Sequence, residues 1–234
     1  MHGQMYLKGM KEGIPVALGY FFVSITIGIA ARLADLTPMQ AAVMSLTNLT
    51  SAGQFASFTL IASGASFVEM AISQAVINLR YCLMSCALSQ KIDHELPMGH
   101  RLCMAFGITD EIFGLCISQK GKLEPWYMYG VMSVAIPGWV AGTVLGILST
   151  GVLPQPLLNA MSMALYGMFI AVFVPAARDN RILVPIIGIA MAASAVFQLP
   201  TMFDFISSGM KIIILTLVIS MAVALLFPIQ EEES

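Results

Sequence analysis

The sequence predicts an all-α, polytopic integral membrane protein with seven or eight transmembrane helices, at least one of them discontinuous. Apolar residues make up 58% of the 234 residues and charged residues only 10%, whereas about 25% of residues are charged in soluble domains. So few charges cannot cover a globular surface with polar groups. The 19 glycines and 18 methionines fit helices that approach one another closely in lipid.

Eight apolar segments are each long enough for a full or partial helical crossing of a bilayer. Short connections rich in proline, glycine and polar residues separate them. The segments are 14–34, 39–63, 67–88, 102–118, 126–148, 157–174, 183–200 and 211–228. We expect a single membrane domain over residues 1–234, in which 13–120 and 121–230 are candidate repeat halves.

A recurring spacing suggests these two halves. Nine residues separate Gly28 from Pro38, ahead of a segment of small residues, and the same spacing separates Gly146 from Pro156 ahead of Asn159. Internal repeats are common in membrane transport proteins, and each half would then present a corresponding interrupted helix.

Basic residues in the connections give a weak indication of orientation. The run 14–31 follows two lysines and exceeds the roughly 7–15 apolar residues of a signal-peptide core, so we expect it to remain as a membrane anchor. With the N-terminus inside and eight crossings, the inside would hold Lys8, Lys11, Lys120, Lys122, Arg178 and Arg181, and the outside Arg32, Lys91, Arg101 and Lys211. Positive charge favours the inside. An aromatic belt at the membrane interface is predicted for Trp126, Tyr127 and Tyr129.

Polar residues crowd the centre of the second apolar segment and predict a broken helix there. Unwound backbone at membrane depth is tolerated only where it lines a cavity or is buried in protein, and it offers backbone groups to a substrate. The alternative is a continuous helix, bent by Ser and Thr hydroxyls that bond to i−4 carbonyls. We expect the substrate contacts of this segment to come from Thr47, Asn48, Ser51, Gly53 and Gln54.

The third segment holds an arginine near its centre. On an unbroken helix Arg80 lies about 160° from Asn78, which shares a face with Tyr81. Because an Arg at this depth costs about 2.5–3.5 kcal/mol on insertion scales, it needs a partner or a wet cavity. Either the helix is interrupted or protein packs on both sides; the alternative is that Arg80 snorkels to the Leu88 end. We expect Asn78 and Tyr81 to contact substrate.

The fourth segment holds two adjacent carboxylates, Asp110 and Glu111, between Gly107 and Gly114. Side chains 100° apart on a helix can face different neighbours, so one can pair with Arg80 while the other remains free to titrate. The alternative is an ion pair that only holds two helices together. No charged residue occurs from Tyr127 to Ala177, which places the charged chemistry in the first half of the chain.

Sequence patterns of enzymes and metal sites are absent. We find no GxSxG, HExxH, Walker or dinucleotide-binding motif, and the three histidines lie near the terminus or in one polar loop. We therefore expect neither enzymatic activity nor a cofactor or metal, and no nucleic-acid partner. The four cysteines fit small packing residues. A transporter is favoured over a channel, which would need a filter signature, and over an accessory or sensor subunit.

Three ordered motifs resemble the AzlC-type branched-chain amino acid exporter (permease) family. They are Ser51-Ala52-Gly53-Gln54-Phe55, Asn78-Leu79-Arg80-Tyr81 and Thr109-Asp110-Glu111-x-Phe113. The likeness extends from Gly13 to about Phe227 and is strongest in the first half. Tyr81 stands where many members have histidine, which puts a proton role for that position in doubt.

The resemblance implies a multi-pass permease of the plasma membrane, as in the bacterial inner membrane. It implies efflux of leucine, isoleucine, valine and methionine together with a small AzlD-type membrane subunit. Residue chemistry adds the hypothesis that Asp110 or Glu111 couples efflux to protons, with Arg80 as the electrostatic partner.

Overall fold

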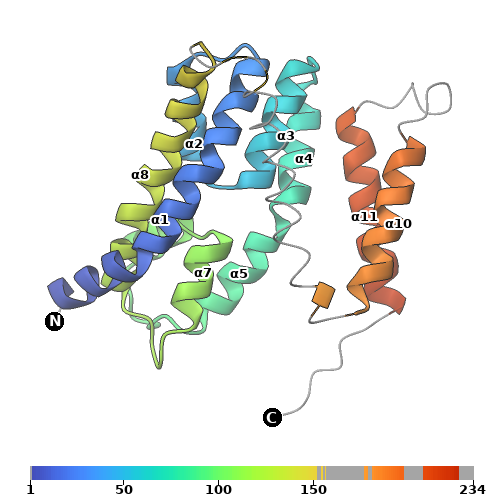
Figure 1. Ribbon diagram of the computed structural model, residues 1–234. Helices are drawn as coiled ribbons and strands as arrows, with labels where there is room; N and C mark the ends of the chain where they lie inside the picture. The colour runs from blue at the N-terminus through green and yellow to red at the C-terminus, as the bar shows by residue number, and fades with distance from the viewer. Residues whose placement is uncertain are drawn as a thin grey trace. The chain divides into compact units, whose positions relative to one another are not determined.

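The computed structural model describes residues 2–151, 154, 156, 177, 178, 181–197 and 208–226. Within them every regular element is a helix, which confirms the predicted all-α class there (Figure 1). The chain divides into two units, Met1–Thr59 with Ile77–Leu165 and Leu60–Val76 with Tyr166–Ser234. The helices are α1 (His2–Leu33), α2 (Pro38–Thr47), α3 (Ser51–Ala62), α4 (Phe67–Ile77), α5 (Leu79–Ser89), α6 (Met98–Phe106), α7 (Asp110–Ile117), α8 (Pro125–Ser149), α10 (Leu183–Phe197) and α11 (Ser208–Leu226).

Among the described residues, α1 and α8 are long and apolar enough to cross a membrane, and α4 with α5 adds a third crossing if the bent pair counts as one. At 1.5 Å per residue α1 is about 48 Å long, more than the roughly 30 Å of a hydrocarbon core. The total of seven or eight crossings stays a prediction. The expected span 157–174, and with it the second member of the repeat, lies outside the described residues.

Glycines bring α1 and α8 close together along their length (Figure 1). A Cβ added to Gly28 would collide with the Thr143 carbonyl, and one added to Gly146 would collide with the Ile25 carbonyl. Contacts between small residues let membrane helices approach until their backbones touch. This pair of helices therefore forms the spine of the first unit.

The predicted second span, 39–63, is two short helices instead of one. α2 begins with a capping box, in which Thr37 Oγ1 accepts from the Gln40 amide and the Gln40 side chain accepts from the Thr37 amide. The chain leaves the helix at 48–50, as the polar run predicts. Gln54 Nε2 donates to Ser45 Oγ across this break at 2.6 Å. Nine residues of straight helix would span about 13 Å, so the chain must bend back here.

The predicted fourth span, 102–118, is a helical hairpin rather than a crossing. α6 and α7 have nine and eight residues, about 12–14 Å each, too short to cross a bilayer. The Leu123 amide donates to the Lys91 carbonyl at 2.8 Å, and Lys91 Nζ donates to the carbonyls of Ile117 and Gln119. The chain before α6 therefore lies beside the chain after α7.

The third segment is interrupted, as one reading of the sequence predicted. α4 ends at Ile77 and α5 begins at Leu79, with Asn78 between them at φ −95° and ψ 4°. The Asn78 carbonyl accepts from the Tyr81 amide at 2.9 Å, which starts the new helix directly after the break.

The hairpin corrects the assignment of basic residues to the two sides of the membrane. A crossing at 102–118 predicts Lys91 and Arg101 on the side of the membrane opposite Lys120 and Lys122. Instead Lys122 pairs with Asp93 at 3.2 Å, and Arg101 donates to the carbonyls of residues 93, 94 and 96. All four basic residues lie at the end of the first unit that also holds the start of α1.

The structure removes Tyr127 from the predicted aromatic belt. The Trp126 ring is partly exposed and makes an edge contact with Tyr129 at a centroid distance of 5.8 Å. Tyr127 is instead fully buried and donates to Glu12 Oε2 at 2.5 Å. A carboxylate on α1 explains the difference, because it gives the phenol a partner inside the protein.

In the second unit, α10 and α11 lie side by side. They correspond to the predicted segments 183–200 and 211–228, of which 198–200, 227 and 228 lie outside the described residues.

Candidate functional site

The two predicted carboxylates lie in the first turn of α7, not in the middle of a longer helix. Thr109 caps this helix, because its Oγ1 accepts from the Ile112 amide at 3.3 Å. Asp110 and Glu111 follow directly, where the positive end of the helix dipole favours negative charge. The break between α6 and α7 thus creates a helix N-terminus that carries both acids, with Asp110 half-buried and Glu111 exposed.

Tyr20 links the first turn of α7 to α1 by hydrogen bonds. Its hydroxyl lies 2.5 Å from Thr109 Oγ1 and donates to Glu111 Oε2 at 2.6 Å. Since a phenol has only one proton to donate, Thr109 must donate to the Tyr20 oxygen while Tyr20 donates to the carboxylate. Tyr20 is buried, so the Glu111 carboxylate accepts a hydrogen bond from the core of the bundle.

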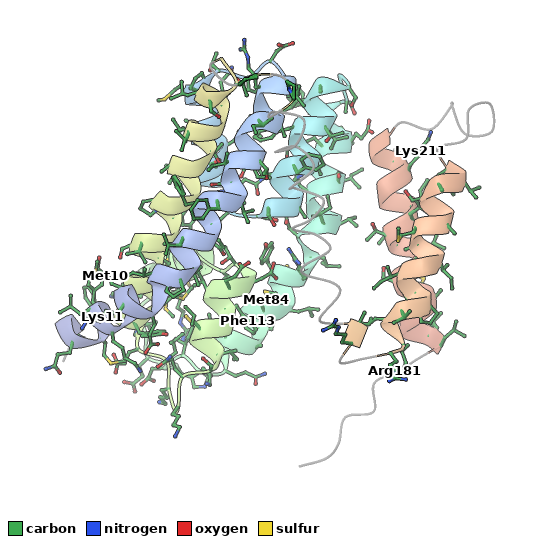
Figure 2. The ribbon with its side chains drawn as sticks, viewed as in Figure 1. Met10, Lys11, Met84, Phe113, Arg181 and Lys211 are labelled. Carbon is green, nitrogen blue, oxygen red and sulfur yellow. The ribbon has the colours of Figure 1, made fainter. Side chains whose placement is uncertain are left out.

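Asp110 pairs with Arg80, as the sequence suggested for one of the two acids. Arg80 Nη2 lies 2.9 Å from Asp110 Oδ2, and the two side chains are 42% and 38% exposed. The guanidinium also lies over the Tyr81 ring, 5.2 Å from its centroid, a cation–π geometry. Figure 2 labels Met84 on α5 and Phe113 on α7, where these helices run side by side. Arg80 therefore points toward α7 instead of snorkelling to the Leu88 end.

The break between α2 and α3 approaches the same place. Thr50, its last residue, is buried and lies near the Tyr81 phenol. Thr50 Oγ1 also accepts from the Gly53 amide at 3.3 Å, which starts α3. Two chain breaks and the start of α5 thus meet around Tyr81 and the Arg80–Asp110 pair.

Gln54 belongs to a separate, fully buried network. Its Nε2 donates to Ser45 Oγ at 2.6 Å, and its Oε1 accepts from the Trp139 indole at 2.9 Å. Ser45 Oγ in turn donates to Thr143 Oγ1 at 2.8 Å. Both ends of the Gln54 amide are therefore hydrogen-bonded to residues of α2 and α8. These bonds hold the bend between α2 and α3 against α8.

The other predicted substrate residues of this segment lie around the break. The Thr47 hydroxyl donates to the Val43 carbonyl at 2.8 Å, so the i−4 bond proposed as the alternative to a break occurs together with the break. Asn48 and Ser51 are half-buried and Gly53 is buried. Asn78 is half-buried beside Arg80. Arg80, Tyr81, Asp110 and Glu111 are thus brought to one place, whereas Gln54 is held apart from them.

Sequence reasoning missed Tyr20 and Trp139, whose ring centroids lie 5.4 Å apart. Aromatic residues in apolar helices are common and ordinarily pack against lipid or neighbouring helices, so neither position stood out. A weak signal was available, because each carries a polar atom that a lipid-facing position could not satisfy. Among the described residues no group of three or more His, Cys, Asp or Glu is placed to hold a metal ion.

Comparison with known proteins identifies the family. The family model described as AzlC protein matches residues 15–153. The chain belongs to the AzlC family. The match includes the whole site from Tyr20 to Thr143, and it confirms the resemblance read from the three motifs.

Relatives of this AzlC-family chain are membrane proteins. It is 27% identical over 190 residues to an uncharacterized membrane protein of Archaeoglobus fulgidus, covering 80% of this chain and 83% of that protein. It is 25% identical over 206 residues to the inner membrane protein YgaZ of Escherichia coli, covering 83% of each. No solved structure matches the chain.

Proposed function

We propose that this AzlC-family protein is a secondary transporter of the plasma membrane that exports the branched-chain amino acids leucine, isoleucine and valine, and also methionine, in exchange for protons. One observation carries the proposal: the Arg80–Asp110 ion pair lies beside the Tyr20–Glu111 hydrogen bond, at a helix N-terminus formed by a chain break. Ionisable groups at membrane depth are costly and mark substrate or proton pathways.

Amino acid recognition is assigned to the break at 48–50 and its surroundings. Backbone amides and carbonyls released at a break match an α-carboxylate and an α-ammonium in size and polarity. Asn48 and Ser51 flank the break and are half-buried, so they can reach a ligand. A single methylene changes binding by only about 1–3 kcal/mol in an apolar pocket, so discrimination among leucine, isoleucine, valine and methionine should be modest.

Proton coupling is assigned to Glu111, with Asp110 as the structural partner of Arg80. The two acids differ because a cation neutralises Asp110, whereas the partner of Glu111 among the described residues is the neutral Tyr20 hydroxyl. Protonation of Glu111 therefore does not leave an arginine unpaired. Arg80 can also exchange Asp110 for the carboxylate of a substrate, since both side chains of the pair are more than one-third exposed.

The partner is proposed to be a small AzlD-type membrane subunit. Large apolar side chains on α4, α5 and α6 are exposed in this chain alone, among them Phe67, Leu83 and Leu102. Lipid or a second membrane protein can cover such surfaces, and the family resemblance favours the second membrane protein.

The test is efflux from proteoliposomes that contain this chain and the small subunit, driven by a pH jump. Glu111→Gln should abolish net uphill efflux and retain exchange of amino acid for amino acid, whereas Asp110→Asn should reduce both through damage to the fold. Glu95→Gln removes an exposed acid outside the site and is the matched control. Full proton-driven efflux by both site variants, at matched protein amounts, excludes the coupling role. Amino acid binding without any flux would instead favour an accessory or sensor subunit.

A further inference from the structure

A basic hollow lies at the end of the first unit where α1 and α8 begin. It has a volume of about 400 Å³ and is bounded by the first turns of α1, by the segment that follows α7, and by the start of α8. This hollow lies at the opposite end of α7 from the two carboxylates, and no step of the proposed transport uses it.

Lysines dominate the charge of the hollow. Lys8, Lys120 and Lys122 line it with a single acid, Glu124, and two further acids, Glu12 and Asp93, contact Lys8 and Lys122 from outside the lining. Lys8 Nζ donates to Gln119 Oε1 at 2.8 Å and lies 5.5 Å from the centroid of the Tyr127 ring. These contacts fix an ammonium group at the wall, although Glu12 Oε1 also lies 3.8 Å away.

Lys120 and Lys122 are brought to the rim by a tight turn. Gly121 between them has φ +74°, a conformation that favours glycine because it has no Cβ. Asp93 holds Lys122 at 3.2 Å, and the Glu95 amide and the Lys122 ammonium together hold the pKa of Asp93 below its usual range. The pair is therefore charged at neutral pH. It is exposed, so it contributes little stability and can open toward a ligand.

The remaining wall is apolar and lies at the level expected for the edge of the bilayer. Met5, Leu123 and the Tyr127 ring complete the lining. Trp126 and Tyr129, which make the edge contact described above, lie in the first turns of α8, where aromatic rings mark the membrane interface. The hollow thus presents cations on one side and an apolar wall on the other.

We propose that this hollow binds the phosphate headgroup of an anionic phospholipid. Lysines suit phosphate because each donates up to three hydrogen bonds from a compact charge. Six basic residues gather at this end: Lys8, Lys11, Lys91, Arg101, Lys120 and Lys122. The positive-inside rule assigns such an end to the cytoplasm, where the leaflet carries the anionic lipids that attract basic segments. A soluble phosphate compound shares the phosphate chemistry but has no acyl chains for the apolar wall.

The experiment measures the melting temperature of the purified full-length chain in neutral detergent. Phosphatidylglycerol, phosphatidylcholine, glycerol 3-phosphate and inorganic phosphate are added separately, since a ligand that binds only the folded state raises the melting temperature. We expect a rise of several degrees with phosphatidylglycerol alone. If glycerol 3-phosphate or inorganic phosphate raises the melting temperature as much as phosphatidylglycerol does, the ligand is a soluble phosphate and not a lipid. If phosphatidylcholine raises the melting temperature equally, the hollow does not recognise the anionic headgroup.

Variants test whether the lipid binds in this hollow or to the positive charge of the surface in general. The double change Lys120→Gln, Lys122→Gln should remove more than half of the rise. Lys11→Gln, on the same end of α1 (Figure 2) but not among the residues that line the hollow, should retain it. Glu124→Gln should enlarge the rise, an outcome that misfolding cannot produce. Equal losses in Lys11→Gln and the double variant, or no gain in Glu124→Gln, overturn the proposal.

Discussion

Gln54 and Arg80 were both predicted to serve the site, yet their surroundings give them different roles. Gln54 is fully buried, and core residues satisfy both atoms of its amide. The Arg80 side chain is 42% exposed and has an acid as its partner. A buried, satisfied amide stabilises one packing arrangement, whereas a partly exposed charge can change partners. We infer that Gln54 positions the bend and that Arg80 takes part in the chemistry.

Gln54→Ala is therefore expected to lower stability before it lowers substrate affinity. The change leaves the Trp139 indole and the Ser45 hydroxyl without their amide partner inside the core, at a cost of about 1–3 kcal/mol. The measurement is the melting temperature in detergent, with substrate affinity determined on the folded fraction. Thr59→Ala, at an exposed position of the same helix, is the control and should change little. An unchanged melting temperature in Gln54→Ala would contradict this role.

At the level of helices, the short helices position functional side chains at their ends. The long helices α1 and α8 contribute by packing closely against each other. α7 begins at Thr109, and the N-terminus created there holds both acids. α1 and α8 meet through glycines whose added Cβ atoms would collide with the opposite backbone. The first feature positions chemistry, and the second provides the rigid frame on which that chemistry depends.

Thr109→Ala should loosen the first turn of α7. Loss of an N-cap costs about 1 kcal/mol, and the change also removes the hydroxyl that contacts Tyr20. We expect a lower melting temperature and a larger fractional loss of efflux, since Asp110 and Glu111 both depend on this turn. Thr109→Ser keeps the capping oxygen and should restore both quantities. If Thr109→Ser is as impaired as Thr109→Ala, the cap is not the cause.

Gly142→Ala tests the contact between the long helices. The added methyl group would meet Ser24 Oγ and the Phe21 carbonyl, and overpacking of this kind costs about 1–3 kcal/mol. Gly19→Ala is the control on α1, because nothing lies within 4 Å of its Cβ position. Alanine also favours a helix over glycine, so this control should keep or raise the melting temperature. Equal effects of the two changes would argue against close packing at Gly142.

At the scale of the whole molecule, the sequence predicted two of the three helix breaks in the first half of the chain but not where the chain turns back. The polar run around Asn48 predicted one interruption, and the charge at Arg80 predicted a second as one of two readings, because unsatisfied polar groups are costly in lipid. The break before Asp110 was not predicted. Hydropathy reports only how apolar a segment is. The segment 102–118 therefore looked like a crossing, and its reversal depends on Lys91 capping a helix end more than 20 residues away in sequence.

The reversal also predicts which side of the membrane each loop faces. Asp93 precedes α6 and Lys120 follows α7, so the hairpin places them on the same side as Gly3, whereas a crossing helix would separate them. Arg32 lies at the other end of α1. Single cysteines at these four positions are introduced after Cys82, Cys86, Cys103 and Cys116 are replaced, and a membrane-impermeant maleimide is applied to right-side-out and inverted vesicles.

We expect Asp93→Cys, Lys120→Cys and Gly3→Cys to react in inverted vesicles, because the concentration of lysines and arginines at this end assigns it to the cytoplasm. Arg32→Cys should react in right-side-out vesicles. Labelling of Asp93→Cys and Lys120→Cys from opposite sides would show that 102–118 crosses the membrane. It would contradict the hairpin, and with it the helix N-terminus that carries the two acids. If all four cysteines react from the side opposite to the expected one, the hairpin is still supported, but the basic hollow lies on the outer face of the membrane.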